Sequence, residues 1–360
     1  MDGIRWRTNR AVDQEAVMMI HNLVSTIIPV FNRPQMLRVA VASVLAQTHR
    51  PIEIIIADDG STDQTPEVAG ELVEQAPEII RYARHDNAGP GPARELGRTL
   101  ARGEFLQYLD SDDRLLPNKF SDQIAVLRDH PECSVAYGVT RLVDQHGDVL
   151  ADPFKWTARE IPELFPGLLV DRWWCTHTPL YRRSLTDQIG PWCDMRWSQD
   201  WEYDSRIGAL NTKLVHCGTH VSEHVQHDGV RQTSSASWST DPIRLRNRVQ
   251  LMNVLWDGAS KAGVPPSAPE RQHFARWCFA IGRNCAAQAM RPEALQCFDL
   301  AESAAGADGA GRKGVSFYRF LFKTFGAGAT RRIESLTRRV RRRPGAATME
   351  QSFASTTSVK

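Results

Sequence analysis

Residues 24–145 switch repeatedly between two kinds of hydrophobic pattern. Short and nearly continuous apolar runs at 24–30, 52–57 and 105–109 predict buried strands. Between them, apolar residues recur at helical spacing, most clearly over 37–45. Parallel strands buried on both faces read as continuous apolar runs, and strands that alternate with helices form mostly parallel sheets. The pattern therefore predicts an α/β fold with helices covering a mostly parallel sheet.

Changes in composition divide the rest of the chain. A short N-terminal extension, 1–22, precedes the regular α/β segment at 23–145. An irregular region rich in Trp, Pro and His follows at 146–240, with a predicted helix at 200–210 and a strand at 213–217. The region 241–330 is mainly helical, and the tail at 331–360 is basic and then rich in Ser and Thr, which is typical of disorder.

Composition excludes some classes of protein. The formal net charge of +2 over 360 residues argues against a strongly basic nucleic-acid binder, so we expect no nucleic-acid partner. The seven cysteines form no C-x-x-C pair, which is typical of reduced thiols in a cytoplasmic protein. No signal sequence and no apolar run of about 20 residues is apparent, so we expect a location in the cytoplasm or at the inner face of the membrane.

Two acidic clusters follow predicted strands. The strand at 52–57 runs into Asp58-Asp59-Gly60-Ser61-Thr62-Asp63, and the strand at 105–109 runs into Asp110-Ser111-Asp112-Asp113. Ligands bind at the carboxyl ends of strands in such sheets, so both clusters lie where a site is expected. Neighbouring carboxylates repel one another unless a cation neutralises them, and Mg²⁺ or Mn²⁺ suits oxygen ligands. Each cluster also has a simpler interpretation as a turn or a helix start.

Three blocks together resemble family 2 glycosyltransferases. They are Val24-Ser25-Thr26-Ile27-Ile28-Pro29-Val30-Phe31-Asn32-Arg33, the Asp58–Asp63 block, and Gly103-Glu104-Phe105-Leu106 leading to Asp110-Ser111-Asp112-Asp113. Their order and spacing match over about residues 22–230. The resemblance implies the GT-A fold, a Rossmann-like mostly parallel sheet flanked by helices, here with a helical C-terminal extension. It also implies that 23–145 binds a nucleotide-diphospho-sugar donor and that 146–240 binds the acceptor.

The resemblance implies roles for the matching residues of the donor half. Pro29 and Phe31 line the nucleotide pocket, and Asp59 holds the base or ribose. Arg94 lies near the diphosphate or the nucleotide. Beside it, Glu95 stands where the family often has Asn.

Asp110-Ser111-Asp112 resembles the D-x-D element of the family. The resemblance makes Asp112 the first ligand of a divalent cation, Mn²⁺ or Mg²⁺. Asp110 is the second candidate, and the resemblance implies that it contacts the ribose or metal-bound water. We assign Asp113 to the start of the following helix. His227 is implied as a further metal ligand, although a lone histidine is more often structural.

Trp197-Ser198-Gln199-Asp200-Trp201-Glu202 resembles the acidic motif on the acceptor side, with Gln199 in place of the first acid. The resemblance makes Asp200 the general base that takes a proton from the acceptor hydroxyl, with Glu202 as the second candidate. From the residues alone, Asp200 is equally a helix N-cap. Trp173, Trp174 and Trp201 either form a wall against the acceptor or pack in the core.

The predicted activity is the transfer of a sugar, with inversion, to a glycan, a lipid-linked or another hydroxyl acceptor in polysaccharide or glycoconjugate synthesis. One alternative is a sugar nucleotidyltransferase, although residues 30–34 lack the glycine-rich phosphate loop that such enzymes usually have. Another alternative is a protein that binds a nucleotide-sugar or glycan without catalysis.

The segment 331–343 places seven arginines around Ile333, Leu336 and Val340. A basic amphipathic helix of this kind lies on anionic membranes, so the segment is a candidate for peripheral membrane contact. A solvated charged helix explains the same pattern.

Overall fold

The computed structural model describes residues 18–227, 241–306, 314–324 and 326. The chain divides into two compact units, Met1–Phe274 and Ala275–Lys360. Among the described residues, no helix combines the length and the apolar character that crossing a membrane requires. The predicted basic segment at 331–343 and the tail lie outside the described residues.

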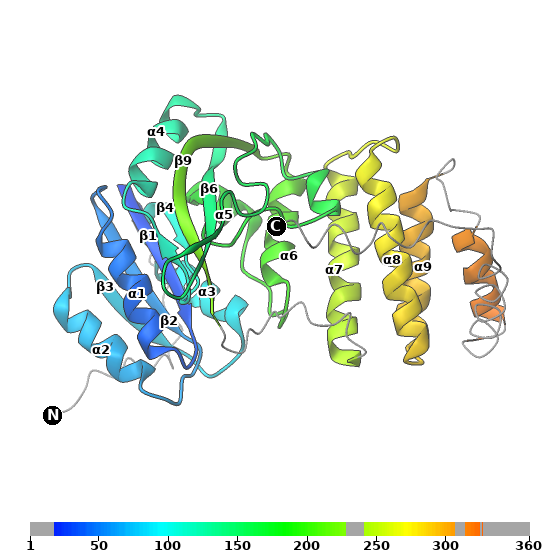
Figure 1. Cartoon of the computed structure of the whole chain (residues 1–360), viewed down its shortest axis with the longest axis horizontal. Helices are drawn as coiled ribbons and strands as arrows, with labels where there is room; N and C mark the ends of the chain where they lie inside the picture. Colours follow the sequence, from blue (N-terminus) through cyan, green and yellow to red (C-terminus); the bar gives the residue numbers. More distant parts are fainter. Residues whose placement is uncertain (1–17, 228–240, 307–313, 325, 327–360) are drawn as a thin grey trace. The chain divides into compact units, whose positions relative to one another are not determined.

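The first unit contains one mixed sheet (Figure 1). Its strand order is β3-β2-β1-β4-β8-β6-β9-β5, with β7 paired to β6. The strands are β1 (Ile20–Val30), β2 (Ile52–Asp58), β3 (Ile80–Arg84), β4 (Gly103–Tyr108), β5 (Arg114–Leu115), β6 (Cys133–Asp144), β7 (Val149–Ala151), β8 (Leu180–Arg182) and β9 (Lys213–Gln226). The predicted α/β fold class is confirmed, although the strands beyond β4 mix parallel and antiparallel pairs.

The first four strands of the sheet are all parallel. β1 pairs with β2 from Val24↔Ile52 to Val30↔Asp58, and with β4 up to Ile27↔Tyr108. Because the strands run the same way, their carboxyl ends meet at one edge of the sheet. This register brings Asp59 and the acidic cluster after β4 to the same edge.

Helices cover both faces of this parallel half. The helices of the first unit are α1 (Pro34–Leu45), α2 (Thr65–Gln75), α3 (Pro90–Leu100), α4 (Lys119–Asp129), α5 (Arg183–Ile189), α6 (Gln199–Ala209) and α7 (Pro242–Lys261), with a short 3₁₀ turn η1 (Gly167–Leu169). Side chains of α1, α2 and α4 share one core with Val24, Ile28 and Val30 of β1. Because side chains alternate along a strand, Ile27 faces the opposite side, where it packs against α3.

The second half of the sheet carries a further helical layer. α7 packs against α6, where the Ser205 hydroxyl donates to the Val254 carbonyl at 3.1 Å. α8 (Pro269–Ala287) crosses the boundary between the two units. In the second unit, Phe298 of α9 (Arg291–Ala305) packs against Phe279, Tyr318 and Phe322, with ring centroids 5.2 to 5.7 Å apart. Tyr318 and Phe322 belong to a helix over 314–324.

Three local differences from the sequence predictions have physical reasons. The glycines and prolines at 87–92 predict a loop, but α3 begins at Pro90, because proline is tolerated in the first turn of a helix. β9 continues nine residues beyond the predicted end at Cys217, because β6 supplies backbone partners as far as Gln226. The prediction that Asp113 starts a helix is wrong, since α4 begins only at Lys119.

The packing of α3 on β1 depends on a glycine. A Cβ atom at Gly97 would lie 2.3 Å from Cγ2 of Ile27, whose side chain is fully buried. We predict that Gly97→Ala lowers the free energy of unfolding by about 1–3 kcal/mol, as overpacked core substitutions do. Chemical denaturation of the purified variant measures this loss.

Gly70→Ala is the matched control. Gly70 also lies inside a helix, α2, but a Cβ atom there would have no neighbour within 4 Å. Alanine is the better helix former, so we expect this variant to gain up to about 1 kcal/mol. Equal effects of the two substitutions would contradict the packing described for α3.

Candidate active site

A cavity of about 320 Å³ opens at the carboxyl ends of β1, β2 and β4. Five aspartates and four basic side chains are among the residues that line it: Asp59, Asp110, Asp112, Asp113, Asp200, Arg33, Arg94, Lys155 and Arg172. Pro29 and Phe31 also line it, at and just after the end of β1. The structure thus brings the predicted donor residues, the two acids Asp110 and Asp112, and Asp200 to the walls of one cavity. His227 and the second base candidate, Glu202, do not line it.

Asp59 is fixed by backbone amides. Its Oδ1 accepts a hydrogen bond from the Ala88 amide at 2.7 Å, and its Oδ2 accepts one from the Gly89 amide at 2.9 Å. Gly89 has φ +99°, a conformation that favours glycine, and it immediately precedes α3. The loop at 87–89 therefore holds the Asp59 carboxylate in one orientation at the cavity wall.

The two acids of the D-x-D element are each paired with an arginine. Nη2 of Arg94 lies 2.5 Å from Oδ1 of Asp110, and Nη1 of Arg33 lies 2.5 Å from Oδ2 of Asp112. His227 is absent from the cavity lining, but its Nε2 lies 2.9 Å from the same oxygen of Asp112. Nε2 of His227 and Oδ2 of Asp112 therefore lie close together.

Arg94 is a buried arginine at the cavity wall, and part of its guanidinium makes no hydrogen bond among the described residues. Its side chain is 4% exposed, and it stacks on the Trp192 ring at 4.9 Å. Within the described part of the chain, its buried Nε and Nη1 have no hydrogen-bond acceptor. Buried donors are rarely left unpaired, so these two N–H groups at a cavity wall are suited to an anionic ligand.

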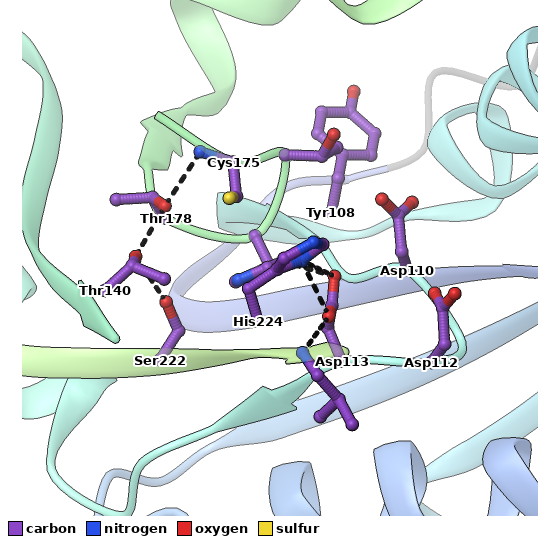
Figure 2. Close-up of polar contacts among 12 residues, drawn as sticks. Tyr108, Asp110, Asp112, Asp113, Thr140, Cys175, Thr178, Ser222 and His224 are labelled. Carbon is purple, nitrogen blue, oxygen red and sulfur yellow. Dashed lines mark hydrogen bonds and ion pairs between the residues drawn. The ribbon is translucent and has the colours of Figure 1, made fainter. Parts of the chain in front are cut away.

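Asp113 points away from the other acids and into the protein (Figure 2). It is 2% exposed, and its Oδ1 accepts a hydrogen bond from the Val225 amide at 2.9 Å. Nδ1 of His177 lies 2.8 Å from its Oδ2, and Nδ1 of His224 lies 3.0 Å from its Oδ1. Burial alone would raise the pKa of Asp113, but the two imidazoles outweigh it and hold that pKa well below its usual range.

Asp200 lies in the first turn of α6. The N-cap of this helix is Ser198, so the alternative that Asp200 itself is the N-cap is wrong. Its Oδ2 lies 2.9 Å from Nη1 of Arg172. Burial raises the pKa of Asp200, but Arg172 and then Arg94 lower it further than burial raises it. Asp200 is therefore a carboxylate at neutral pH.

Arg172 joins Asp200 to a second acid that is almost fully buried. Its Nε donates to Oδ2 of Asp204 at 2.6 Å, and Nε1 of Trp174 donates to the same oxygen at 2.8 Å. Burial raises the pKa of Asp204, and Arg172 opposes that rise. The guanidinium is thus the cation that allows two acids to lie one turn apart at this wall.

The tryptophans predicted either to contact the acceptor or to pack in the core differ in their positions. Trp173 and Trp174 are fully buried, and Trp173 packs edge-on against Tyr137 at 5.2 Å. Trp174 also reaches the cavity lining, whereas Trp173 and Trp201 are not part of it. Core packing is therefore the better interpretation for Trp173.

Several residues of the cavity carried no signal in the sequence. Lys155 and Arg172 of the lining, and His177 buried behind it, come from the irregular region 146–240, where no periodicity or strand end marks them. Cys175-Thr176-His177 places two potential metal ligands close together in the sequence. They form a group of three only because β9 brings His224 beside them. Glu202, the second candidate for the base, is paired with Arg206 on its own helix.

Comparison with known proteins shows which family and relatives this chain resembles. The family model described as Glycosyl transferase family 2 matches residues 25–189. An uncharacterized glycosyltransferase of Nostoc sp. is 33% identical over 181 residues, which are 48% of this chain and 55% of that protein. One from Rickettsia bellii is 35% identical over 142 residues, 39% of this chain and 20% of that protein. The chain thus spans about half or less of these relatives' length.

The fold has solved counterparts. The crystal structure of S. aureus TarS 1-349 in complex with UDP has a TM-score of 0.63 with this chain, at 15% identity, covering 88% of this chain and 91% of that one. Its complex with UDP-GlcNAc gives 0.61 at 16% identity, covering 88% and 92%. These likenesses establish the predicted GT-A type of fold. Through residues 25–189 the chain belongs to glycosyl transferase family 2.

We predict that Arg172→Met lowers the free energy of unfolding by about 3–5 kcal/mol, because it leaves Asp204 buried without a cation. Urea denaturation measures the loss. Arg38→Met removes a surface arginine paired with Glu71, whose side chain is 55% exposed, so this control should change stability by no more than about 1 kcal/mol. Similar losses in the two variants would contradict the role given to Arg172.

Proposed function

We propose that this chain transfers a sugar from a nucleotide-diphospho-sugar to an acceptor hydroxyl, with inversion. The observation that carries the proposal is the meeting of Asp59, the D-x-D acids and Asp200 at one cavity. In this proposal residues 23–145 bind the donor and 146–240 bind the acceptor. The acceptor is a glycan, a lipid-linked molecule or another hydroxyl compound in polysaccharide or glycoconjugate synthesis.

The donor occupies the side of the cavity formed by β1, β2 and α3. Asp59 accepts hydrogen bonds from the base or the ribose, beside the apolar surface of Pro29 and Phe31. Arg94 binds the diphosphate through the N–H groups that lack acceptors among the described residues. UDP is the first nucleotide to test, because one of the TarS structures with this fold is a complex with UDP.

The ligand set suits a divalent cation, Mn²⁺ or Mg²⁺. Asp112 offers a carboxylate oxygen with the Nε2 of His227 2.9 Å away, and Asp110 lies two residues before it. Carboxylate and imidazole donors of this kind are common for Mn²⁺, and carboxylates with phosphate oxygens suit Mg²⁺. When bound, the cation neutralises negative charge on the leaving nucleoside diphosphate. Arg33 and Arg94 neutralise Asp112 and Asp110 until then.

Asp200 is the general base in this proposal. It is already ionised at neutral pH, and it shares the cavity with the donor residues. Its low pKa makes it a weak base while Arg172 holds it. Arg172 also faces the cavity, so an anionic ligand that draws this guanidinium away strengthens Asp200 as a proton acceptor. The basic segment 331–343 remains a candidate for peripheral contact with an anionic membrane.

We predict that Asp200→Asn reduces transfer by about 10²–10⁴-fold while nucleotide binding survives, because general-base catalysis contributes about that factor. Product formation from labelled nucleotide-sugars over an acceptor panel measures the first quantity, and calorimetry measures the second. Glu202→Gln is the control, since Glu202 pairs with Arg206 and does not line the cavity. It should retain most of the activity.

The same assays separate the rival functions. Near-normal turnover by Asp200→Asn would show that the base is assigned wrongly. Release of pyrophosphate from a nucleoside triphosphate and a sugar phosphate would favour a nucleotidyltransferase. Binding of nucleotide with neither donor hydrolysis nor transfer would favour a non-catalytic binding protein.

A further inference from the structure

Behind the D-x-D acids lies a second group of metal-binding side chains. Cys175, His177 and His224 each offer a ligand atom, and these three atoms lie within 4.8 Å of one another. Cys175 and His224 line the cavity, whereas His177 is fully buried behind them. We propose that Cys175, His177 and His224 bind a divalent cation of the zinc class, separate from the oxygen ligands of Asp110 and Asp112.

The side chain of His177 is the strongest indication of a ligand. It is 0% exposed, and within the described ranges neither its Nδ1, beside Asp113, nor its Nε2 makes a hydrogen bond. A buried imidazole nitrogen without a partner is costly, and coordination of a metal removes that cost. Asp113 does not account for Nε2, because the carboxylate lies beside Nδ1 of the same ring.

Asp113 has the position of a supporting carboxylate. Its oxygens lie 2.8 Å from Nδ1 of His177 and 3.0 Å from Nδ1 of His224. Metal-binding histidines usually donate their second ring nitrogen to a carboxylate, which fixes the tautomer and the ring orientation. Asp113 thus lies beside both imidazole rings of the proposed site, where a carboxylate can fix their orientation.

Other contacts hold the three ligands in place. The Cys175 amide donates to the Thr178 hydroxyl at 3.2 Å, and a chain of hydroxyls continues through Thr140 to Ser222 of β9, at 2.7 and 2.9 Å (Figure 2). Ser222 and His224 are two residues apart on one strand, so their side chains share a face. The loop that carries Cys175 and His177 is thus tied to the strand that carries His224.

The donor set selects the class of metal. A thiolate and two imidazoles suit Zn²⁺, whereas Mg²⁺ prefers oxygen ligands. A thiol loses its proton when it binds a metal, so binding of the metal releases a proton from Cys175. Because Cys175 and His224 face the cavity, a fourth coordination position is open to a ligand there.

Cobalt titration of the full-length protein tests the site without any activity assay. Co²⁺ replaces Zn²⁺ in such sites, and a bound thiolate gives a thiolate-to-cobalt charge-transfer band in the near ultraviolet. We expect wild type to develop this band and to saturate at one ion per chain. Cys175→Ser should lose the band, and the control Cys217→Ser should keep it, because Cys217 is outside the cluster. Absence of the band in wild type, or its survival in Cys175→Ser, overturns the proposal.

A second measurement on the wild-type protein covers the case in which Cys175→Ser does not fold. Zn²⁺ should slow alkylation of Cys175 by iodoacetamide about tenfold at a concentration about ten times its dissociation constant, since the metal-free fraction equals 1/(1 + [L]/Kd). Labelling of Cys217, followed by peptide mass spectrometry, should not change. Equal labelling of Cys175 with and without Zn²⁺ overturns the proposal. Asp112→Asn should keep the cobalt band, which separates this site from the proposed donor site.

Discussion

The ion pairs between the aspartates and arginines of the cavity are the condition on which this arrangement depends. Five carboxylates surround a space of about 320 Å³, and uncompensated acids at that density would repel one another or take up protons. Arg94 and Arg33 neutralise the two D-x-D acids, and Arg172 neutralises Asp200 and Asp204. The parallel sheet sets the positions of the strand ends, and these guanidinium groups make their acidic side chains compatible with folding.

The pairs Arg94–Asp110 and Arg33–Asp112 also bear on how ligands enter the cavity. In the proposed function, the diphosphate binds Nε and Nη1 of Arg94 and shares that guanidinium with Asp110, so Asp110 is less fully neutralised than before. In the same proposal, a divalent ion bound by Asp112 and Asp110 supplies the missing positive charge. In the proposed function, the binding of donor and the binding of metal therefore support each other, because each removes a charge that the other leaves uncompensated.

The sequence predicted β1, β2 and β4 of the parallel half well, because each is a nearly continuous apolar run that ends in polar residues. It also identified Asp59, Asp110, Asp112 and Asp200, which the structure brings to one cavity. It did not predict Arg172, His177 or the position of Asp113. Those residues acquire their partners from β9 and from the irregular region after residue 146, through contacts more than 25 residues apart in the chain. Local patterns carry no information about such contacts.

Calorimetric titration of UDP with and without Mn²⁺, on wild type and on Asp112→Asn, tests the central claim most directly. A metal-assisted nucleoside diphosphate site predicts that Mn²⁺ strengthens UDP binding to wild type. It also predicts that this strengthening falls by at least about tenfold in Asp112→Asn, since lost metal-site groups typically cost that much affinity. Equal UDP binding with and without Mn²⁺ in wild type, or an undiminished Mn²⁺ effect in Asp112→Asn, would contradict the account.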